Sequence, residues 1–168
     1  MIAVAGDEGL YLLAFADGRR AAAEIRRLRR RLARPIVAGP HRHIERVERE
    51  LRRYFAGRLR TFLVPVALAG TPFQLAVWRR LGRIPFGRVQ TYAGLARALG
   101  RPRAQRAVGL ANGANPLAIV VPCHRLVGSD GALTGYGGGL WRKRRLLELE
   151  GAPLASAGPL CQRPEVRA

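Results

Sequence analysis

The feature that most constrains the fold is a helix-start signal near the middle of the chain, Thr71-Pro72-Phe73-Gln74. The hydroxyl of Thr71 can accept a hydrogen bond from the backbone N–H of Gln74, and the Gln74 side chain can bond back to the backbone of Thr71. Proline is favoured at the first helical position, where its missing N–H needs no partner. We therefore expect a helix to begin here and a domain boundary just before it, near Ala69-Gly70.

The length of the chain fits two small units. A chain of 168 residues can hold one ordinary domain or two small ones, with a real hydrophobic core. We assign residues 1–69 to an N-terminal α/β domain, residues 70–151 to a C-terminal domain, and residues 152–168 to a loose tail.

The N-terminal part predicts a hairpin and two helices. Gly6-Asp7-Glu8-Gly9 separates two short apolar runs, as in a β-hairpin, and Pro65 argues against a central strand. The expected elements are strands over Ile2–Ala5 and Leu10–Phe15, helices over Ala21–Ala33 and His41–Phe55, and an edge strand or extended linker over Phe62–Val66.

The C-terminal part predicts short helices and one buried strand. Gly100-Arg101-Pro102 separates two helical segments, which is typical of a helix-turn-helix. Small residues dominate the second of these helices, so it can approach a nucleic-acid backbone closely. The expected elements after the capped helix are helices over Thr91–Leu99, Pro102–Asn112 and Leu140–Glu150, a buried strand over Ala118–Val121, and a glycine-rich loop over Gly128–Gly139.

Basic residues far outnumber acidic ones, and acidic residues are missing from a long stretch. The chain has 30 Lys and Arg against 11 Asp and Glu, a net charge of +19. A GC-rich genome can raise the arginine count, but it does not explain why no Asp or Glu occurs from Leu51 through Ser129. A surface that binds a polyanion explains this absence, because each carboxylate would repel phosphate. We expect Arg79–Arg125 to face nucleic acid, whereas Arg19–Arg49, with interleaved Glu, is interpreted as a solvated face.

The two cysteines, Cys123 and Cys161, are too few for a disulfide framework. The N-terminus has no signal-peptide pattern, and no run approaches the ~18 apolar residues of a membrane span. We expect a cytoplasmic protein in a reducing compartment, with no membrane partner. Cys161 lies in the tail and is interpreted as incidental.

The residues that carry chemistry surround Cys123. Adjacent residues of a strand point to opposite faces, so Cys123 and His124 can interact only if a turn begins at Pro122. Glu150 falls on an apolar helical face, where a carboxylate needs a partner. His124 is one candidate partner, which would give a nucleophile, a base and an orienting group; an arginine is an equally good one. Asn115, just upstream, can hydrogen-bond a thiolate.

These motifs, in this order between Thr71 and Gly151, resemble the O6-alkylguanine-DNA alkyltransferase family, whose members are also called methylated-DNA–protein-cysteine methyltransferases. The resemblance is carried by Gln90-Thr91-Tyr92, Arg106-Ala107-Val108-Gly109, Asn115-Pro116, Pro122-Cys123-His124-Arg125, Gly135-Tyr136-Gly137-Gly138-Gly139 and Glu150-Gly151. It implies an α+β fold: a small ribonuclease-H-like N-terminal α/β domain, then a mostly helical, winged-helix-like domain with a helix-turn-helix.

The resemblance implies a role for each matching residue. Cys123 would accept the alkyl group, and His124 would take its proton through a water while Glu150 holds the imidazole. Asn115 would brace the active-site turn. Tyr92 would push the target nucleotide out, and Arg106 would fill the gap in the stack. The remaining implied contacts with base or DNA are Ala107, Gly109, Arg125, Leu126, Tyr136 and Gly137.

The implied function is DNA repair by direct reversal. A base buried in the duplex must be flipped out before a thiolate can reach its O6 atom. The alkyl group of O6-alkylguanine, and of O4-alkylthymine, would move irreversibly to Cys123, once per molecule. The implied partner is double-stranded DNA bound through the minor groove by a monomer. No cofactor or metal is implied, because no cysteine precedes Cys123, and His41 with His43 is interpreted as a solvated pair.

Two other classes compete with this hypothesis. A non-catalytic, basic helix-turn-helix DNA-binding protein accounts for the charge and for Arg106 but leaves Cys123, His124 and Glu150 unexplained. A cysteine hydrolase with the same three residues accounts for them but not for the acid-free arginine surface. Reaction with methylated duplex DNA and with an activated ester separates these possibilities.

Overall fold

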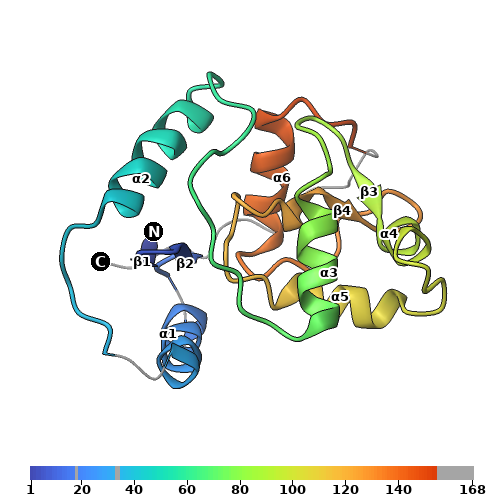
Figure 1. The fold of residues 1–168 in the computed structure, drawn as a ribbon. Coiled ribbons are helices and arrows are strands. Elements are labelled where there is room, and N and C mark those ends of the chain that lie inside the picture. The colour runs from blue at the N-terminus through green and yellow to red at the C-terminus, as the bar shows by residue number, and fades with distance from the viewer. Residues whose placement is uncertain (18, 33–34, 155–168) are drawn as a thin grey trace.

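The computed structural model describes residues 1–17, 19–32 and 35–154, and Cys161 and most of the expected tail lie outside this range. The N-terminal half contains β1 (Ile2–Gly6), β2 (Gly9–Ala14), α1 (Arg19–Leu32) and α2 (Arg42–Phe55). The C-terminal half contains α3 (Pro72–Leu81), β3 (Gln90–Thr91), α4 (Tyr92–Ala98), α5 (Gln105–Gly113), a 3₁₀ turn (Cys123–Arg125), β4 (Leu126–Val127) and α6 (Leu140–Leu149). Figure 1 shows the two sets of elements side by side, with the segment that joins α2 to α3 running between them.

The N-terminal half confirms the predicted hairpin and helices. Strands β1 and β2 pair antiparallel, with an irregularity between Val4 and Ala5. Helix α1 begins at Arg19, two residues earlier than expected, and α2 is capped by His41, whose side chain accepts a hydrogen bond from the His43 backbone N–H. The side chain of His43 is buried, and its Nε2 lies 3.4 Å from the carbonyl oxygen of Asp7. The expectation of a solvated histidine pair is therefore wrong for His43.

The segment between the halves is an extended linker. Its one ladder contact in the described part of the chain is a parallel bridge between Val66 and Leu10. The capping box that follows it is confirmed: the Gln74 N–H donates to Thr71 Oγ1 at 3.3 Å, and the Thr71 N–H donates to Gln74 Oε1 at 3.0 Å. Local sequence thus determines where α3 begins.

The helix-turn-helix consists of α4 and α5. Gly100 ends α4 with a left-handed φ of 69°, a conformation that glycine adopts without strain. Helix α5 begins at Gln105 rather than near Pro102. The backbone N–H of Ala104 donates to the carbonyl of Arg101, so these residues form a separate turn before the helix.

The expected strand over Ala118–Val121 is wrong, because the chain reverses there. Leu117 pairs with Leu13 of β2 for a single bridge, after which Ile119 takes a φ of 72°. The Val121 N–H donates back to the carbonyl of Leu117 at 2.9 Å. A β-branched residue rarely adopts a positive φ, so contacts from outside the turn must hold Ile119 in place.

One cluster of buried apolar side chains includes residues of both halves. It contains Leu10, Leu13 and Val47 from the N-terminal half and Val77 and Leu95 from the C-terminal half. The bridge between β2 and Leu117 ties the active-site segment to the hairpin, so the N-terminal half helps position that segment. The boundary near Ala69-Gly70 stays a prediction. Among the described residues, no helix has the length and apolar character needed to cross a membrane.

Candidate active site

A turn at Pro122 brings Cys123 and His124 into one site. Pro122 has φ −79° and ψ 62°, and the Cys123 N–H donates to the carbonyl of Val121 at 2.8 Å, which is an inverse γ-turn. The 3₁₀ turn over Cys123–Arg125 follows at once. The condition under which the two residues can act together, a turn at Pro122, is therefore met. Both side chains are buried.

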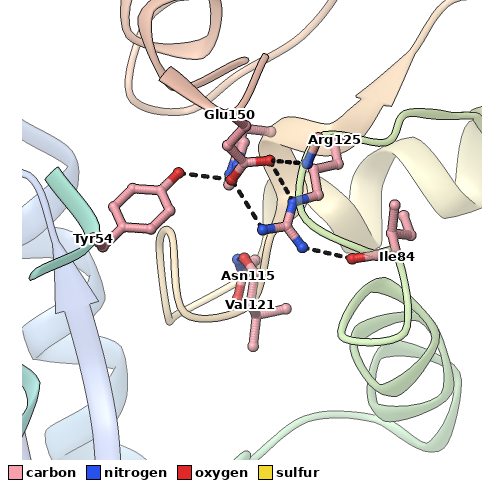
Figure 2. Close-up of polar contacts among 8 residues, drawn as sticks. Tyr54, Ile84, Asn115, Val121, Arg125 and Glu150 are labelled. Carbon is pink, nitrogen blue, oxygen red and sulfur yellow. Dashed lines mark hydrogen bonds and ion pairs between the residues drawn. The ribbon is translucent and has the colours of Figure 1, made fainter. Parts of the chain in front are cut away.

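Glu150 is the centre of a buried polar network. Its Oε1 lies 2.9 Å from His124 Nε2 and accepts hydrogen bonds from the Tyr54 hydroxyl at 2.7 Å and from Arg125 Nη2 at 2.9 Å. Its Oε2 accepts from Arg125 Nε at 2.8 Å and from the Gly87 N–H at 3.2 Å. Figure 2 shows Tyr54 and Arg125 reaching the carboxylate from different sides. Both predicted partners of Glu150, a histidine and an arginine, are present together.

The network sets the charges of its members. Burial alone raises the pKa of Glu150, but hydrogen bonds from His124, Arg125 and Tyr54 outweigh it and lower the pKa to about 2. Burial lowers the pKa of His124, more than its bond to Glu150 raises it. The imidazole is thus neutral beside an ionised carboxylate at neutral pH. Its Nε2–H donates to Glu150, and the buried Nδ1, which has no hydrogen-bond partner among the described residues, carries the lone pair.

Asn115 braces the segment that leads to Cys123. Its Nδ2 donates to the carbonyls of Val121 at 2.9 Å and Leu117 at 3.2 Å, and its Oδ1 accepts from the Leu117 N–H at 3.0 Å. These bonds span the reversed chain around Ile119 and account for its strained conformation. The predicted bracing contact between Asn115 and the turn is present in this geometry.

Two hollows meet at the loop over residues 134–138. An inner cavity contains Cys123 and is walled by both halves. An outer, open groove carries Tyr92 and Arg106. Residues that line the inner cavity include Leu12, Phe15, Asn112, Asn115, Cys123 and Tyr136, and those of the groove include Tyr92, Gln105, Arg106, Gly109 and Thr134. Gly113, Tyr136 and Gly137 line both, so the loop that carries Tyr136 and Gly137 lies between Cys123 and the exposed groove.

The predicted DNA-contact residues divide into an exposed set and a buried set. Arg106 and Ala107 are exposed on α5, and Gly109 is half-buried there. Leu126 is buried in β4 and can offer only its backbone to a ligand. Arg125 is also buried, and it donates to Glu150 and to the carbonyl of Ile84. The expectation that the Arg125 side chain contacts base or DNA is therefore wrong: its charge is neutralised inside the protein.

Lys143, the only lysine of the chain, was not among the predicted site residues. It is 0 % exposed, its Nζ donates to the carbonyl of Thr134 at 2.7 Å, and it lies 5.9 Å from the centroid of the Tyr92 ring. Burial lowers its pKa to about 8, and the charge of Cys123 opposes that shift. A lone lysine among 29 arginines was the signal that could have identified it.

Tyr92 faces the same loop as Lys143. The Tyr92 hydroxyl donates to the carbonyls of Thr134 at 3.3 Å and Gly135 at 3.4 Å. Burial raises the pKa of Tyr92, as does the neighbouring charge of Cys123. The side chain therefore stays a neutral hydrogen-bond donor between the groove and Cys123. Within the described residues, no cluster of three His, Cys, Asp or Glu side chains could hold a metal ion.

Comparisons with known proteins agree with this geometry. Residues 72–152 match the family model described as 6-O-methylguanine DNA methyltransferase, DNA binding domain. A methylated-DNA–protein-cysteine methyltransferase of Mycobacterium tuberculosis strain H37Rv is 57% identical over 101 residues, 60% of this chain and 61% of the relative. The corresponding protein of Methanosarcina acetivorans is 54% identical over 104 residues, 62% of this chain and 67% of the relative. The sequence match thus spans about three fifths of the mycobacterial relative.

Solved structures extend the similarity over most of the chain. The crystal structure of a variant of M. tuberculosis OGT has a TM-score of 0.72 and 40% identity, and covers 91% of this chain and 87% of that chain. The structure of M. tuberculosis OGT in complex with DNA has a TM-score of 0.70 and 41% identity, with 89% and 87% covered. With the motifs, the geometry around Cys123 and these matches in agreement, this chain belongs to the O6-methylguanine-DNA methyltransferase family.

Proposed function

We propose that this protein repairs DNA as a methylated-DNA–protein-cysteine S-methyltransferase. The observation that carries the proposal is the buried network of His124 and Glu150 directly behind Cys123, in a cavity that shares its lining with the groove of Arg106 on α5. Neutral His124 Nδ1 is the base that takes the thiol proton, through a water, while Glu150 holds the ring. The thiolate sulfur then attacks the alkyl carbon of O6-alkylguanine.

The chemical step conserves atoms and charge. A C–S bond forms as the bond between the alkyl carbon and O6 breaks, and the electron pair of that bond remains on the guanine. The proton held by His124 can return to the guanine, which leaves as the normal base. The product thioether has no easy leaving group in water, so each protein molecule reacts once. Alkyl groups on O4 of thymine belong to the same proposal.

The proposed substrate is double-stranded DNA, bound through its minor groove. Small residues on the exposed side of α5, such as Ala107 and Gly109, let the helix approach the backbone closely, and no carboxylate opposes it. Tyr92 would displace the target nucleotide, and Arg106 would stack in its place. Tyr136 and Gly137 would form the wall of the base pocket. Backbone groups of Cys123 and Leu126 would read the base edge.

One chain supplies every residue of the proposed site, so we propose that the protein acts as a monomer. We also propose that it acts in the cytoplasm. The N-terminal unit (1–69) and the C-terminal unit (70–151) would act together, because the cavity around Cys123 has walls from both.

Intact mass before and after exposure to a duplex containing O6-methylguanine tests the proposal. We expect the mass to rise by one methyl group per protein and the reaction to stop there, even with excess lesion. Cys123→Ala is the matched control: it should bind the lesion but acquire no methyl group. Methyl transfer in that variant, for example to Cys161, or turnover beyond one equivalent, would contradict the proposal.

A further inference from the structure

Helix α1 carries an excess of positive charge that the proposed function does not use. It has seven arginines and one carboxylate among its 14 residues. Arg26 and Arg30 are exposed and lie one turn apart, on the face opposite the buried Ala21 and Leu28. Packing against the core therefore accounts for the apolar residues of α1 but not for its arginines.

Helix α2 shows how this chain balances arginines on another helix with one exposed face. It has the same length, with five arginines and three carboxylates. Arg46 pairs with Glu50 at 3.0 Å, and Arg52 pairs with Glu48 at 2.7 Å, each pair one turn apart. In the described part of the chain, no carboxylate forms an ion pair with an arginine of residues 26–31.

This difference between the two helices has a cost for α1. Like charges one turn apart on a helix repel each other and destabilise it. A GC-rich genome raises the arginine content of both helices alike, so it does not explain why α1 lacks the carboxylates that α2 has. A polyanion bound along α1 explains the difference, because it supplies the missing negative charge.

The position of α1 identifies the polyanion. Ala21 and Glu24 line the inner cavity together with Gly113 and Gly137, and these two glycines also line the groove of Arg106. The second half of α1 lines another hollow together with the residue that follows α5. Helix α1 therefore lies beside the C-terminal end of α5, next to the surface where DNA would bind.

We propose that α1 binds the phosphate backbone of the DNA duplex on one side of the lesion, with Arg26 and Arg30 as its main contacts. The proposal rests on the proposed binding of DNA by α5 and extends that surface to the N-terminal half. A helix of 14 residues is about 21 Å long, which matches about six base pairs of duplex. The interpretation of Arg19–Arg49 as one solvated face then holds for α2 and not for α1.

The salt dependence of DNA binding counts the phosphate contacts. Binding to an undamaged duplex is measured over a range of NaCl concentrations for the wild type, for Arg26→Gln with Arg30→Gln, and for Arg49→Gln with Arg53→Gln. The α2 pair is the matched control, because both of its arginines are exposed and lie one turn apart. We expect the slope of log K against log salt to fall by about two in the α1 variant and to stay unchanged in the α2 variant.

Two controls separate binding from folding. The α1 glutamine variant loses the repulsion between Arg26 and Arg30, so its thermal unfolding midpoint should equal or exceed that of the wild type. Arg26→Lys with Arg30→Lys keeps both charges, so this variant should keep the wild-type salt slope. A lowered midpoint together with a wild-type salt slope in the glutamine variant would make these arginines structural.

The position of the lesion in the duplex tests whether α1 lies over one flank. O6-methylguanine is placed at the centre of a duplex or about three base pairs from either end, which leaves a flank shorter than α1. The rate of Cys123 methylation is measured with duplex in excess, so that each duplex holds at most one protein. The α1 variant should be slower than the wild type with the central lesion and with one of the two end lesions, and equal to it with the other. Reaction with free O6-benzylguanine should be the same for both proteins.

The outcomes that contradict this contact differ from those that contradict the function. Equal salt slopes in the wild type and the α1 glutamine variant, or equal reductions in the α1 and α2 variants, would exclude a specific contact. Equal losses at both end positions would exclude binding to one flank. A loss found only when several proteins share a duplex would assign α1 to contacts between copies of the chain. Failure of the wild type to methylate Cys123, with the salt slopes as expected, would remove the proposed function and leave the α1 contact in place.

Discussion

The two halves of this molecule carry their functional information in different ways. In the C-terminal half, the proposed nucleophile Cys123, its proposed base His124 and Asn115, which braces the turn, lie within one short segment and form a compact motif. In the N-terminal half no such motif exists, yet Tyr54 donates to Glu150 across 96 positions of sequence. Leu12 and Phe15 wall the cavity of Cys123 from the same half.

The comparisons with known proteins show the same division. The family model covers residues 72–152, and the sequence match to the M. tuberculosis relative covers 60% of the chain, whereas the structure of the M. tuberculosis OGT variant covers 91%. A cavity wall needs shape and apolar character, which many sequences supply. A nucleophile with its base needs particular residues. The N-terminal half is thus part of the site without carrying its signature.

The largest expected effect follows from removing the carboxylate that both halves contact. Glu150→Ala leaves the Arg125 charge buried without its partner and should lower the free energy of unfolding by about 3–5 kcal/mol. Urea unfolding measures this loss. If the variant is as stable as Glu148→Ala, an exposed-side control on the same helix, the network is not the link between the halves that we infer.

Because the Glu150 carboxylate has a lowered pKa, we expect the free energy of unfolding to depend on pH. The pKa of Glu150 is lowered from 4.5 to about 2 in the folded protein, so the unfolded state binds more protons between these values. The stabilisation of roughly 3 kcal/mol is therefore fully present above about pH 4.5 and is lost as the pH falls toward 2. Urea unfolding from pH 7 to pH 3 should show a steeper loss for the wild type than for Glu150→Gln, which cannot titrate.

The next effect should distinguish the arginines of the two halves. Arg106→Ala removes the group proposed to fill the stack, at a cost of roughly a few kcal/mol for flipping. Repair of duplex O6-methylguanine should slow far more than reaction with free O6-benzylguanine, which needs no flipping. Arg49→Ala on α2 should leave both rates unchanged, and Arg97→Ala should only weaken DNA binding and reduce its salt dependence by about one ion. Equal losses for Arg106 and Arg97 on both substrates would make Arg106 an ordinary phosphate contact.

A smaller effect isolates the contribution of the N-terminal half. Tyr54→Phe removes a hydrogen bond to a charged group, worth about 1.5–3 kcal/mol, while keeping the ring against Phe62 and Phe86. With one donor fewer, the Glu150 oxygen holds more negative charge, which raises the pKa of His124. The acidic limb of the alkylation pH profile should therefore move to higher pH. Tyr11→Phe, whose hydroxyl contacts exposed Glu8, should not move it.

The smallest expected change in stability concerns Lys143, and it is a gain, whereas the substitutions of Glu150 and Tyr54 lower the stability. Lys143→Met removes a buried charge and one hydrogen bond, so the net change should be a gain of about 1 kcal/mol at pH 7, with slower alkyl transfer. Because the pKa of Lys143 is lowered to about 8 from 10.5, the unfolded state binds more protons between these values. Wild-type stability should rise with pH across this window, and the variant should lack that rise. A variant that is less stable at pH 7 and transfers at the wild-type rate would show that Lys143 only supports the loop.

Features set by neighbouring residues could be predicted. The capping box at Thr71, the hairpin at Gly6–Gly9 and the face of α6 that presents Glu150 depend on residues a few positions apart. That Glu150 has a polar partner followed from a simple requirement, that a carboxylate among leucines needs one; the sequence left His124 and an arginine as equal candidates. The family motif then supplied the interpretation of Cys123.

Features set by distant residues could not be predicted. Ala118–Val121 has the composition of a strand, but Asn115 and β2 take up its hydrogen bonds and bend it into a turn. Arg125 looked like one more DNA contact, yet it lies inside the protein against Glu150, and His43 is buried against the hairpin.

What the sequence by itself determined is therefore the hairpin, most of the helices and the motif around Cys123, because periodicity, capping and a short motif act over a few residues. Only the tertiary structure decided which polar groups are buried and what they face. Tyr54 and Asn112 look ordinary in the sequence, and Lys143 is distinguished only as the one lysine of the chain. Their partners lie 96, 11 and 9 residues away, and burial strengthens each interaction by removing water from it. Folding thus brings these three side chains into the surroundings of Cys123 and Glu150.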